Sequence, residues 1–526
     1  MNVNTTLNDL YDVGVTSDQL NLIAECDSRS RIAVKTPVGI TKPVDIPSII
    51  AQGECMSSIK CTVTVDSISV NHKESLEDCQ SGPESHNHLY QYKDKVSIPV
   101  LGMVDDQMGV AKCGLDSVLS SVHINSLTNI KRLQFGENKC FKLHIGDNKD
   151  VCSENIIDTW ELNSDKESAS SILEMLDKEG EQKVLLEVTK EKYLGDVIMA
   201  SGSNCLNIQE RMRRGYTAVN QIMQMLEELC LGKYFFETAN ILRRSLLLST
   251  LLSNSEAWYN LTKKDIENLE KVDEALLRRI FSAQCTTPLE VLYLETGNIP
   301  IRFILMSRRL NFLHYILNQN EDSLLRSVFD AQVDNPIRGD WVKQIELDIR
   351  DIGLFLTFDQ IKIMSKEMFK KIVKEKVKKK SFEYLTKIQA THSKAKNIVY
   401  RELSLQTYLG SKSSLTIREK SLIFAARARM LDVKANFKIG KTDLRCRKCL
   451  VDEETQKHLL KCSKLRDNSI VSDSNIPDYE DLYSMDREKV EAIGRVLLHK
   501  YHCLVNCHGA QPGSHQASAA TTSGNG

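Results

Sequence analysis

Residues 96–106 read VSIPVLGMVDD, and they decide how the rest of the chain is interpreted. The apolar run leads to two adjacent carboxylates, Asp105 and Asp106, and apolar residues return at Met108 and Val110. This pattern predicts a β-hairpin with the two aspartates at its tip. Carboxylates at the end of buried strands need a cation beside them, and Mg²⁺ suits the position because carboxylates and substrate phosphates bind it together. The alternative is an ordinary polar turn, in which aspartate is common.

The chain of 526 residues has the composition of a globular protein, with 41% hydrophobic and 26% charged residues. This length predicts about two to four domains and is sufficient for a large hydrophobic core. Lysine and arginine total 69 against 70 aspartates and glutamates, which gives a net charge of −1. A globally basic surface is therefore excluded, and any surface that binds nucleic acid must be local.

The sequence predicts an intracellular protein, nuclear or cytoplasmic, without a membrane partner. Its first residues lack a basic segment followed by an apolar one, so no secretory signal is expected. The most apolar stretch, residues 241–252, is short and contains Arg243 and Arg244, so it is not expected to span a bilayer. In a reducing compartment the 15 cysteines are expected to be free or metal-bound rather than paired.

A second pattern lies near the C-terminus, where the sequence reads CRKCLVDEETQKHLLKC. Cys446 and Cys449 are separated by two residues, and His458 and Cys462 by three. Two cysteines in a tight turn, followed by a histidine and a cysteine on one helix face, can surround Zn²⁺ tetrahedrally. The pattern predicts a closed, structural zinc site. The alternative is a set of unrelated buried thiols.

Residues 362–380, KIMSKEMFKKIVKEKVKKK, predict a basic helix. Met364, Met368, Ile372 and Val373 are expected on one face and the lysines on the other. Such a helix could follow a phosphate backbone with strongly salt-dependent affinity. Few aromatic residues are interleaved, so base stacking is not indicated. The alternative is a lysine-rich face that is simply solvated.

The stretch Met103-Val104-Asp105-Asp106 resembles the C motif of reverse transcriptases, with methionine at a place where the family usually has an aromatic or small apolar residue. Residues 8–465 resemble the reverse transcriptases of non-LTR (LINE-type) retrotransposons. The most family-specific string outside the hairpin is TPLEVLYLETGNIPIRFILMSRRLNFLHYIL, residues 287–317. Its arginines Arg302, Arg308 and Arg309 could meet phosphates, or they could be solvated or paired with acids.

The resemblance assigns roles to further residues. Asp105 and Asp106 would hold the catalytic Mg²⁺. Gln52 and Gly53 match the B motif, where glycine lets the backbone approach the nucleotide and template. Lys139 matches the D motif lysine that acts as general acid toward pyrophosphate, with Lys142 as the second choice. The primer grip is matched by Tyr193, Leu194 and Gly195. Each of these short motifs taken alone is also compatible with a plain turn or strand edge.

The expected fold class is α+β, with a partial polymerase palm built from an antiparallel sheet with helices, followed by mostly helical regions and a small zinc finger. The expected domains are a palm (1–200), a helical thumb and connection (201–320), a helical region with the basic helix (321–435), a CCHC zinc-finger-like segment (436–470), a short helical tail (471–507) and a disordered tail (508–526).

The resemblance implies an RNA-directed DNA polymerase that uses an RNA template, a DNA primer or target and dNTPs. In the family the first catalytic aspartate, in the A motif, lies upstream of the part matched here, and neither Asp9 nor Asp12 has the required strand context. We therefore expect a truncated enzyme that polymerises little or nothing alone. Two alternatives stay open. One is a non-catalytic, zinc-containing RNA- or DNA-binding protein derived from a retrotransposon, and the other is a helical scaffold without nucleic-acid contacts. The sequence does not indicate an oligomeric state.

Overall fold

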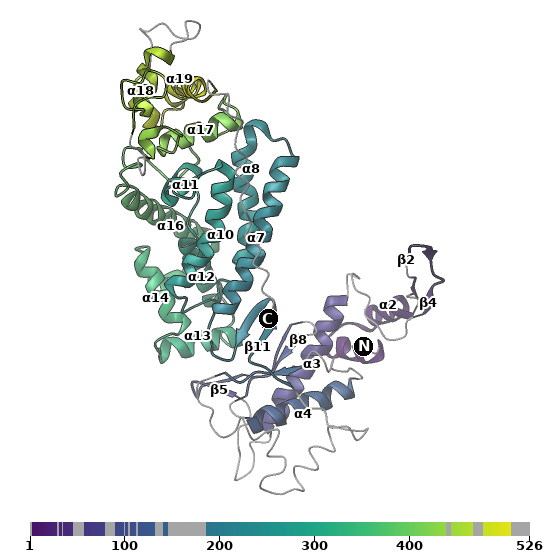
Figure 1. The fold of residues 1–526 in the computed structure, drawn as a ribbon. Coiled ribbons are helices and arrows are strands. Elements are labelled where there is room, and N and C mark those ends of the chain that lie inside the picture. Colours follow the sequence, from purple (N-terminus) through teal and green to yellow (C-terminus); the bar gives the residue numbers. More distant parts are fainter. Residues whose placement is uncertain are drawn as a thin grey trace. The chain divides into compact units, whose positions relative to one another are not determined.

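The computed structural model describes residues 3–28, 31–33, 35–45, 57–78, 90–98, 100–103, 106–111, 114–131, 140–145, 186–437, 443–465 and 477–506. The chain forms two compact units (Figure 1): unit 1 comprises Met1–Asn207 and Ile316–Lys343, and unit 2 comprises Ile208–Tyr315 and Gln344–Gly526. Helices predominate, and the strands form small two-stranded sheets, so the general α+β class is confirmed. In the part of the chain that the structure describes, no helix combines the length and apolar character needed to cross a membrane.

Unit 1 begins with helices that pack around a small core. These helices are α1 (Val3–Asp12), α2 (Ser17–Ser28), α3 (Ser57–Asp78) and α4 (Gly114–Ile130). Helix α3 packs against α1 and α4, and Ile68, Val100 and Ile124 form a buried cluster. Asp9, as expected, is in a helix rather than a strand, and it pairs with Lys131 just after α4. Asp9 therefore serves helix packing.

The strands of unit 1 pair mainly as short hairpins. They are β1 (Arg31–Ile32), β2 (Lys35–Thr36), β3 (Gly39–Ile40), β4 (Val44–Asp45), β5 (Tyr90–Tyr92), β6 (Val96–Ile98), β7 (Leu101–Met103), β8 (Asp106–Met108), β9 (Phe141–Lys142), β10 (Leu186–Glu187), β11 (Lys190–Tyr193) and β12 (Asp196–Met199). The pairs β1–β4, β2–β3, β5–β6, β7–β8 and β11–β12 are antiparallel, and β9–β10 is parallel. The apolar run that starts at Val96 is thus shared between two hairpins. The sequence has Pro99 at the break, and proline has no amide hydrogen for strand pairing.

The hairpin β5–β6 holds helix α13 (Leu324–Asp334), which explains why a later segment belongs to unit 1. The Lys93 ammonium lies 2.6 Å from the Asp340 carboxylate, and the Gln332 side-chain amide donates to the Tyr92 hydroxyl at 3.0 Å. Lys93 and its neighbour Asp94 both have positive φ angles, so they form the tight turn that presents this lysine.

Unit 2 is helical. It contains, wholly or for most of their length, α7 (Cys205–Glu228), α8 (Phe235–Leu242), α9 (Leu248–Leu251), α10 (Lys263–Phe281), α11 (Leu289–Thr296), α12 (Ile301–Leu317), α14 (Trp341–Asp351), α15 (Phe358–Ile363), α16 (Lys366–Gln389), α17 (Ile417–Arg427), α18 (Gln456–Lys461) and α19 (Arg487–Asn506). A π-helical turn, η4 (Arg243–Leu247), joins α8 to α9. Short 3-10 turns are η3 (Gly232–Tyr234), η5 (Lys434–Asn436), η6 (Ser463–Leu465) and η8 (Tyr479–Tyr483). Helix α10 begins with a reciprocal capping box between Thr262 and Asp265, which satisfies backbone groups that the first turn leaves free.

The arginines of α12 are paired with acids rather than free for phosphates. Arg309 makes two hydrogen bonds with Asp348, at 2.6 and 3.0 Å, and both side chains are almost completely buried. Arg302 binds Glu270 in the same two-pronged way, at 2.8 and 2.7 Å. Arg308 donates to the Leu252 backbone carbonyl. The paired alternative is therefore confirmed for Arg302 and Arg309, and Arg308 lies 3.8 Å from the Glu256 carboxylate in addition to its backbone contact.

The basic helix forms as α16, but its buried face differs from the predicted one. Every fourth residue from the first turn onward is buried, and these residues are Phe369, Val373, Val377, Ser381, Leu385 and Gln389. Met368 is exposed, and Met364 lies outside the helix because Ser365 is its N-cap. Of the predicted residues, Val373 is buried and Ile372 is half-buried, because the buried line runs through Phe369 and Val373 and leaves Met368 outside it. The exposed lysines are Lys366, Lys370, Lys371, Lys374, Lys376, Lys379 and Lys387.

Candidate functional site

The first two cysteines of the predicted metal site lie on a tight backbone loop. Arg445 and Glu453 form an isolated antiparallel bridge at its base. The amide of Cys446 donates to the Asp452 carbonyl at 2.7 Å, and the amide of Leu450 donates to the Cys446 carbonyl at 2.9 Å. Leu450 has a φ angle of 60°, a left-handed conformation that turns the chain sharply. The loop thus presents the Cys446 and Cys449 thiols on one side.

The other two ligands come from the short helix α18 and the residue that follows it. Thr455 caps this helix by accepting a hydrogen bond from the His458 amide at 2.9 Å. The helix ends at Lys461, and Cys462 is its C-cap with an extended ψ angle. His458 and Cys462 were predicted on one helix face. This is wrong in detail, because the six-residue helix stops before the cysteine, but the extended C-cap still turns its thiol toward the histidine.

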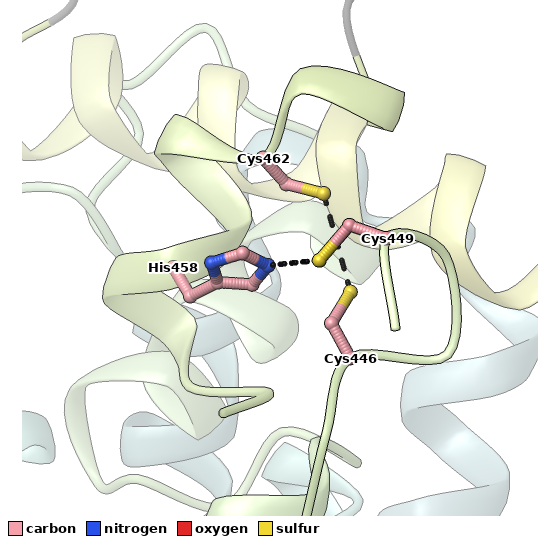
Figure 2. Close-up of side chains that lie close together, drawn as sticks. All are labelled: Cys446, Cys449, His458 and Cys462. Carbon is pink, nitrogen blue, oxygen red and sulfur yellow. Dashed lines mark hydrogen bonds between the residues drawn. The ribbon is translucent and has the colours of Figure 1, made fainter. Parts of the chain in front are cut away.

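The four side chains converge on one point (Figure 2). The Cys446 and Cys462 Sγ atoms are 4.0 Å apart, and the Cys449 Sγ is 3.4 Å from the His458 Nε2. All four ligand atoms lie within 4.8 Å of one another. In a tetrahedral zinc site with Zn–S bonds of about 2.3 Å, two sulfurs are about 3.8 Å apart. The Cys3His group could therefore hold a metal ion, and its geometry and donor set are compatible with zinc.

The thiols differ in how readily they lose a proton without a metal. Burial, followed by the neighbouring Cys446 thiol, raises the pKa of Cys462 to about 11. Backbone amides of Val451 and Asp452 hydrogen-bond the Cys449 sulfur and lower its pKa to about 7. A metal ion must displace the proton of Cys462, since thiolate is the form that binds. The bound ion would supply a closed structural cross-link, because all four positions are taken by side chains.

Residues between the ligands orient and anchor the site, and sequence reasoning missed them. The Asp452 carboxylate lies 3.4 Å from the His458 Nδ1, so the opposite ring nitrogen faces the thiols. The completely buried Glu454 carboxylate accepts hydrogen bonds from the side chain and the backbone amide of Arg447 and from the Lys434 amide. The only sequence signal was the group of acidic residues in the spacer. Carboxylates that contact a ligand histidine typically fix its orientation.

The segment with the four candidate ligands, residues 446–462, packs into the main core of unit 2. The buried cluster formed by residues of α17 and α19 also contains Cys446, Leu459, Leu460 and Cys462. The Gln456 side-chain amide donates to the Ala426 carbonyl of α17 at 2.9 Å. The segment is thus part of the same folded core as α17 and α19.

The predicted acidic hairpin forms from β7 and β8, with Met103 opposite Asp106. Asp106 is the first residue of β8 rather than part of the connection, and its side chain is exposed. Helix α3 packs closely against β7, since a Cβ at Gly102 would lie 3.6 Å from a methyl carbon of Val65. Asp105 lies outside the described residues. Mg²⁺ binding at this hairpin stays a prediction.

The predicted primer-grip residues form a second hairpin in the same unit. Tyr193 ends β11, and Leu194 and Gly195 form a two-residue turn with φ angles of 47° and 90°. Two consecutive positive φ angles are typical of the hairpin turn that matches strand twist. Burial raises the pKa of Tyr193, and the negative charge of Asp106 raises it further. Residues of the two predicted motifs therefore lie near each other.

Other predicted residues remain untested. Gln52, Gly53 and Lys139 lie outside the described residues. Lys142 lies in β9, where only its backbone is described. Within the described residues, Cys446, Cys449, His458 and Cys462 form the one group of three or more potential metal ligands.

Comparison with known proteins adds no identification. No family model matches the chain, and no curated protein sequence matches it.

Proposed function

We propose that this chain is a reverse transcriptase-like protein of the non-LTR retrotransposon type, with nucleic-acid contacts and a structural zinc site. The observation that carries the proposal is that the acidic hairpin β7–β8, with Asp106 at the start of β8, and the primer-grip hairpin β11–β12, with Tyr193 at the end of β11, both form in unit 1. In the resemblance, the acidic hairpin and the primer-grip turn are separate motifs that must lie close together to act on one primer end. The Cys3His group supports the same origin, because the resembling family carries a CCHC segment in the corresponding place.

The proposed chemistry is phosphoryl transfer from a dNTP to a DNA primer on an RNA template. Asp105 and Asp106 would hold Mg²⁺ against the triphosphate, and Lys139 would protonate the leaving pyrophosphate. Gln52 and Gly53 would border the nucleotide and template. Asp9 pairs with Lys131 in helix packing and does not supply the further carboxylate that two metal ions need. We therefore propose that this chain alone polymerises little or nothing.

Primer extension with Mg²⁺ or Mn²⁺ tests this proposal. The wild type is compared with the double variant Asp105→Asn/Asp106→Asn, and Asp94→Asn serves as the control, because Asp94 is an exposed aspartate on the neighbouring hairpin turn. We expect weak or no synthesis, and divalent-ion binding that the double variant loses and the control keeps. Robust template-dependent synthesis by the wild type contradicts the low activity. Unchanged ion binding in the double variant contradicts the role of the hairpin.

The second candidate function is a non-catalytic, zinc-containing nucleic-acid-binding protein, and α16 favours it. This helix contains nine lysines and three glutamates. Lys370, Lys371 and Lys374 are exposed near its start, on the sides of the helix that the buried Phe369 and Val373 do not occupy. Exposed lysines of this density attract phosphates without reading the bases, and they release counterions when they bind.

Gel-shift measurements over a salt series separate the two candidates. The triple variant Lys370→Glu/Lys371→Glu/Lys374→Glu should bind RNA and DNA more weakly, with a salt slope reduced by up to about three. A variant with the same charge change on α10, at Lys263, Lys264 and Lys271, is the control. The second candidate predicts that Asp106→Asn leaves affinity unchanged. If no RNA or DNA is retained at low salt, both candidates are wrong and the scaffold alternative is favoured.

A further inference from the structure

A chain of hydrogen bonds joins α3 to α4, which lie side by side in unit 1 (Figure 1). The Ser120 hydroxyl is 3.0 Å from the Nε2 atom of His72, and the His72 Nδ1 is 2.9 Å from the His123 Nδ1. His72 is only 1% exposed, and His123 is half-buried. Two ring nitrogens at this distance need one proton between them, because one must donate and the other accept.

We propose that His72 and His123 form a pH-sensitive clasp that holds α3 against α4 while the two rings share a proton, and that opens when both rings are protonated. With both rings charged, each Nδ1 carries a hydrogen and neither can accept. The contact then becomes a repulsion between two cations that burial keeps from water. This device depends on the fold of unit 1 alone and not on the proposed polymerase origin.

Among the side chains that the structure describes, no acid offsets the positive charge that protonation of His72 would bring. The described charged side chains on the elements around the pair are Lys60, Asp66 and Lys73 on α3, Lys131 after α4, Asp9 on α1 and Asp106 on β8. Burial, followed by the charge of His123, lowers the pKa of His72 from 6.5 to about 4, and none of those side chains contributes. Burial also lowers the pKa of His123.

The lowered pKa values of His72 and His123 determine how the stability of unit 1 changes with pH. The folded state binds protons at His72 less readily than the unfolded chain, so its stability rises with pH in the window from about 4 to 6.5. Stability is lost as the pH falls through this window. The change is at most about tenfold in the unfolding equilibrium for each pH unit and each histidine.

The clasp lies beside the acidic hairpin. A Cβ at Gly102 in β7 would meet Val65 and Ser69 of α3, and a Cβ at Gly109, after β8, would lie 3.9 Å from the Ser120 hydroxyl. Both helices therefore support the hairpin that carries Asp106. When α3 and α4 separate, the hairpin loses the surface on which it packs.

Hydrogen exchange measured by mass spectrometry on the full chain tests the proposal. After correction for intrinsic exchange rates, peptides from α3 and α4 should lose protection between pH 7 and pH 5, while peptides from α10 in unit 2 should not. The double variant His72→Gln/His123→Gln has no titrating ring and should show pH-independent protection. The control His392→Gln, a surface histidine paired with Glu290, should behave like the wild type.

Wild-type protection of α3 and α4 that does not change with pH overturns the proposal, and so does a pH-dependent loss that persists in the double variant. If the double variant does not fold, histidine ring signals of the wild type decide the question by NMR. We expect one buried ring with a midpoint near pH 4. A normal midpoint near 6.5 for every histidine ring overturns the clasp.

Discussion

Replacement of Cys446 by serine removes one of the four candidate metal ligands and should abolish tight zinc binding. The thiol is completely buried, so the change affects metal affinity and the core together. Loss of a ligand should weaken zinc binding by at least about a hundredfold, which removes about 2.7 kcal/mol of stabilisation at saturating zinc. A serine hydroxyl left buried without a partner adds about 1–3 kcal/mol. The expected loss of about 4–6 kcal/mol is large beside a typical unfolding free energy of about 5–15 kcal/mol.

The assay has two readouts on protein purified with a reductant. Metal analysis after gel filtration should give one zinc per wild-type chain and much less for Cys446→Ser. Urea unfolding in the presence of zinc should show the full difference in stability between the wild type and Cys446→Ser. In excess chelator this difference should shrink to the smaller part that the buried serine hydroxyl causes. Cys503→Ser is the control, because Cys503 is half-buried in the same unit and contacts His499 instead of the cluster. A zinc-free wild type, a variant that keeps a full equivalent, or an equal loss in the control refutes the reasoning.

Three further predictions concern the metal site and the core of unit 2. Zinc affinity should fall by about tenfold per pH unit for each proton released as the pH drops from 8 to 6, because the metal-free pKa of Cys462 is about 11. Competition with a chelator measures the affinity, and an affinity that does not change with pH contradicts the prediction. Gly297→Ala should lower the free energy of unfolding by several kcal/mol, since the φ angle of Gly297 is 69° and a Cβ would lie 2.3 Å from the backbone of Ser404. The control Gly202→Ala has a similar φ angle but open space around the Cβ, so thermal unfolding should show a loss of only about 1 kcal/mol. Asp348→Ala should lower the free energy of unfolding by about 3–5 kcal/mol, because it leaves the buried Arg309 charge unpaired. Urea unfolding should show a much smaller loss for the double variant Arg309→Met/Asp348→Leu, which removes both charges.

Features that depend on neighbouring residues could be predicted from the sequence. The ligands Cys446, Cys449, His458 and Cys462 lie within one short stretch, so a turn and a helix are sufficient to bring them together. The β7–β8 hairpin is equally local, because a two-residue connection fixes its register. The general α+β class followed from the same local patterns.

Features that depend on distant parts of the chain could not be predicted. The partner of Arg309 is Asp348 on another helix, and no periodic pattern links the two residues. The His72–His123 contact likewise joins two helices whose packing the sequence does not specify. The buried face of α16 was misjudged because packing against other elements, α11 above all, selects it, and that packing is not written in the local sequence pattern.

The four-residue spacing of the buried side chains on α16 limits the shape of any polyanion that binds there. Each step of four residues turns about 40° beyond one full helical turn, so the core-facing line rotates by about 200° between Phe369 and Gln389. Lys370 and Lys387 consequently point in different directions from opposite ends of the helix. Lys370 and Lys387 point about 100° apart around the helix axis, so a strand that curves around the helix matches their path better than a straight one.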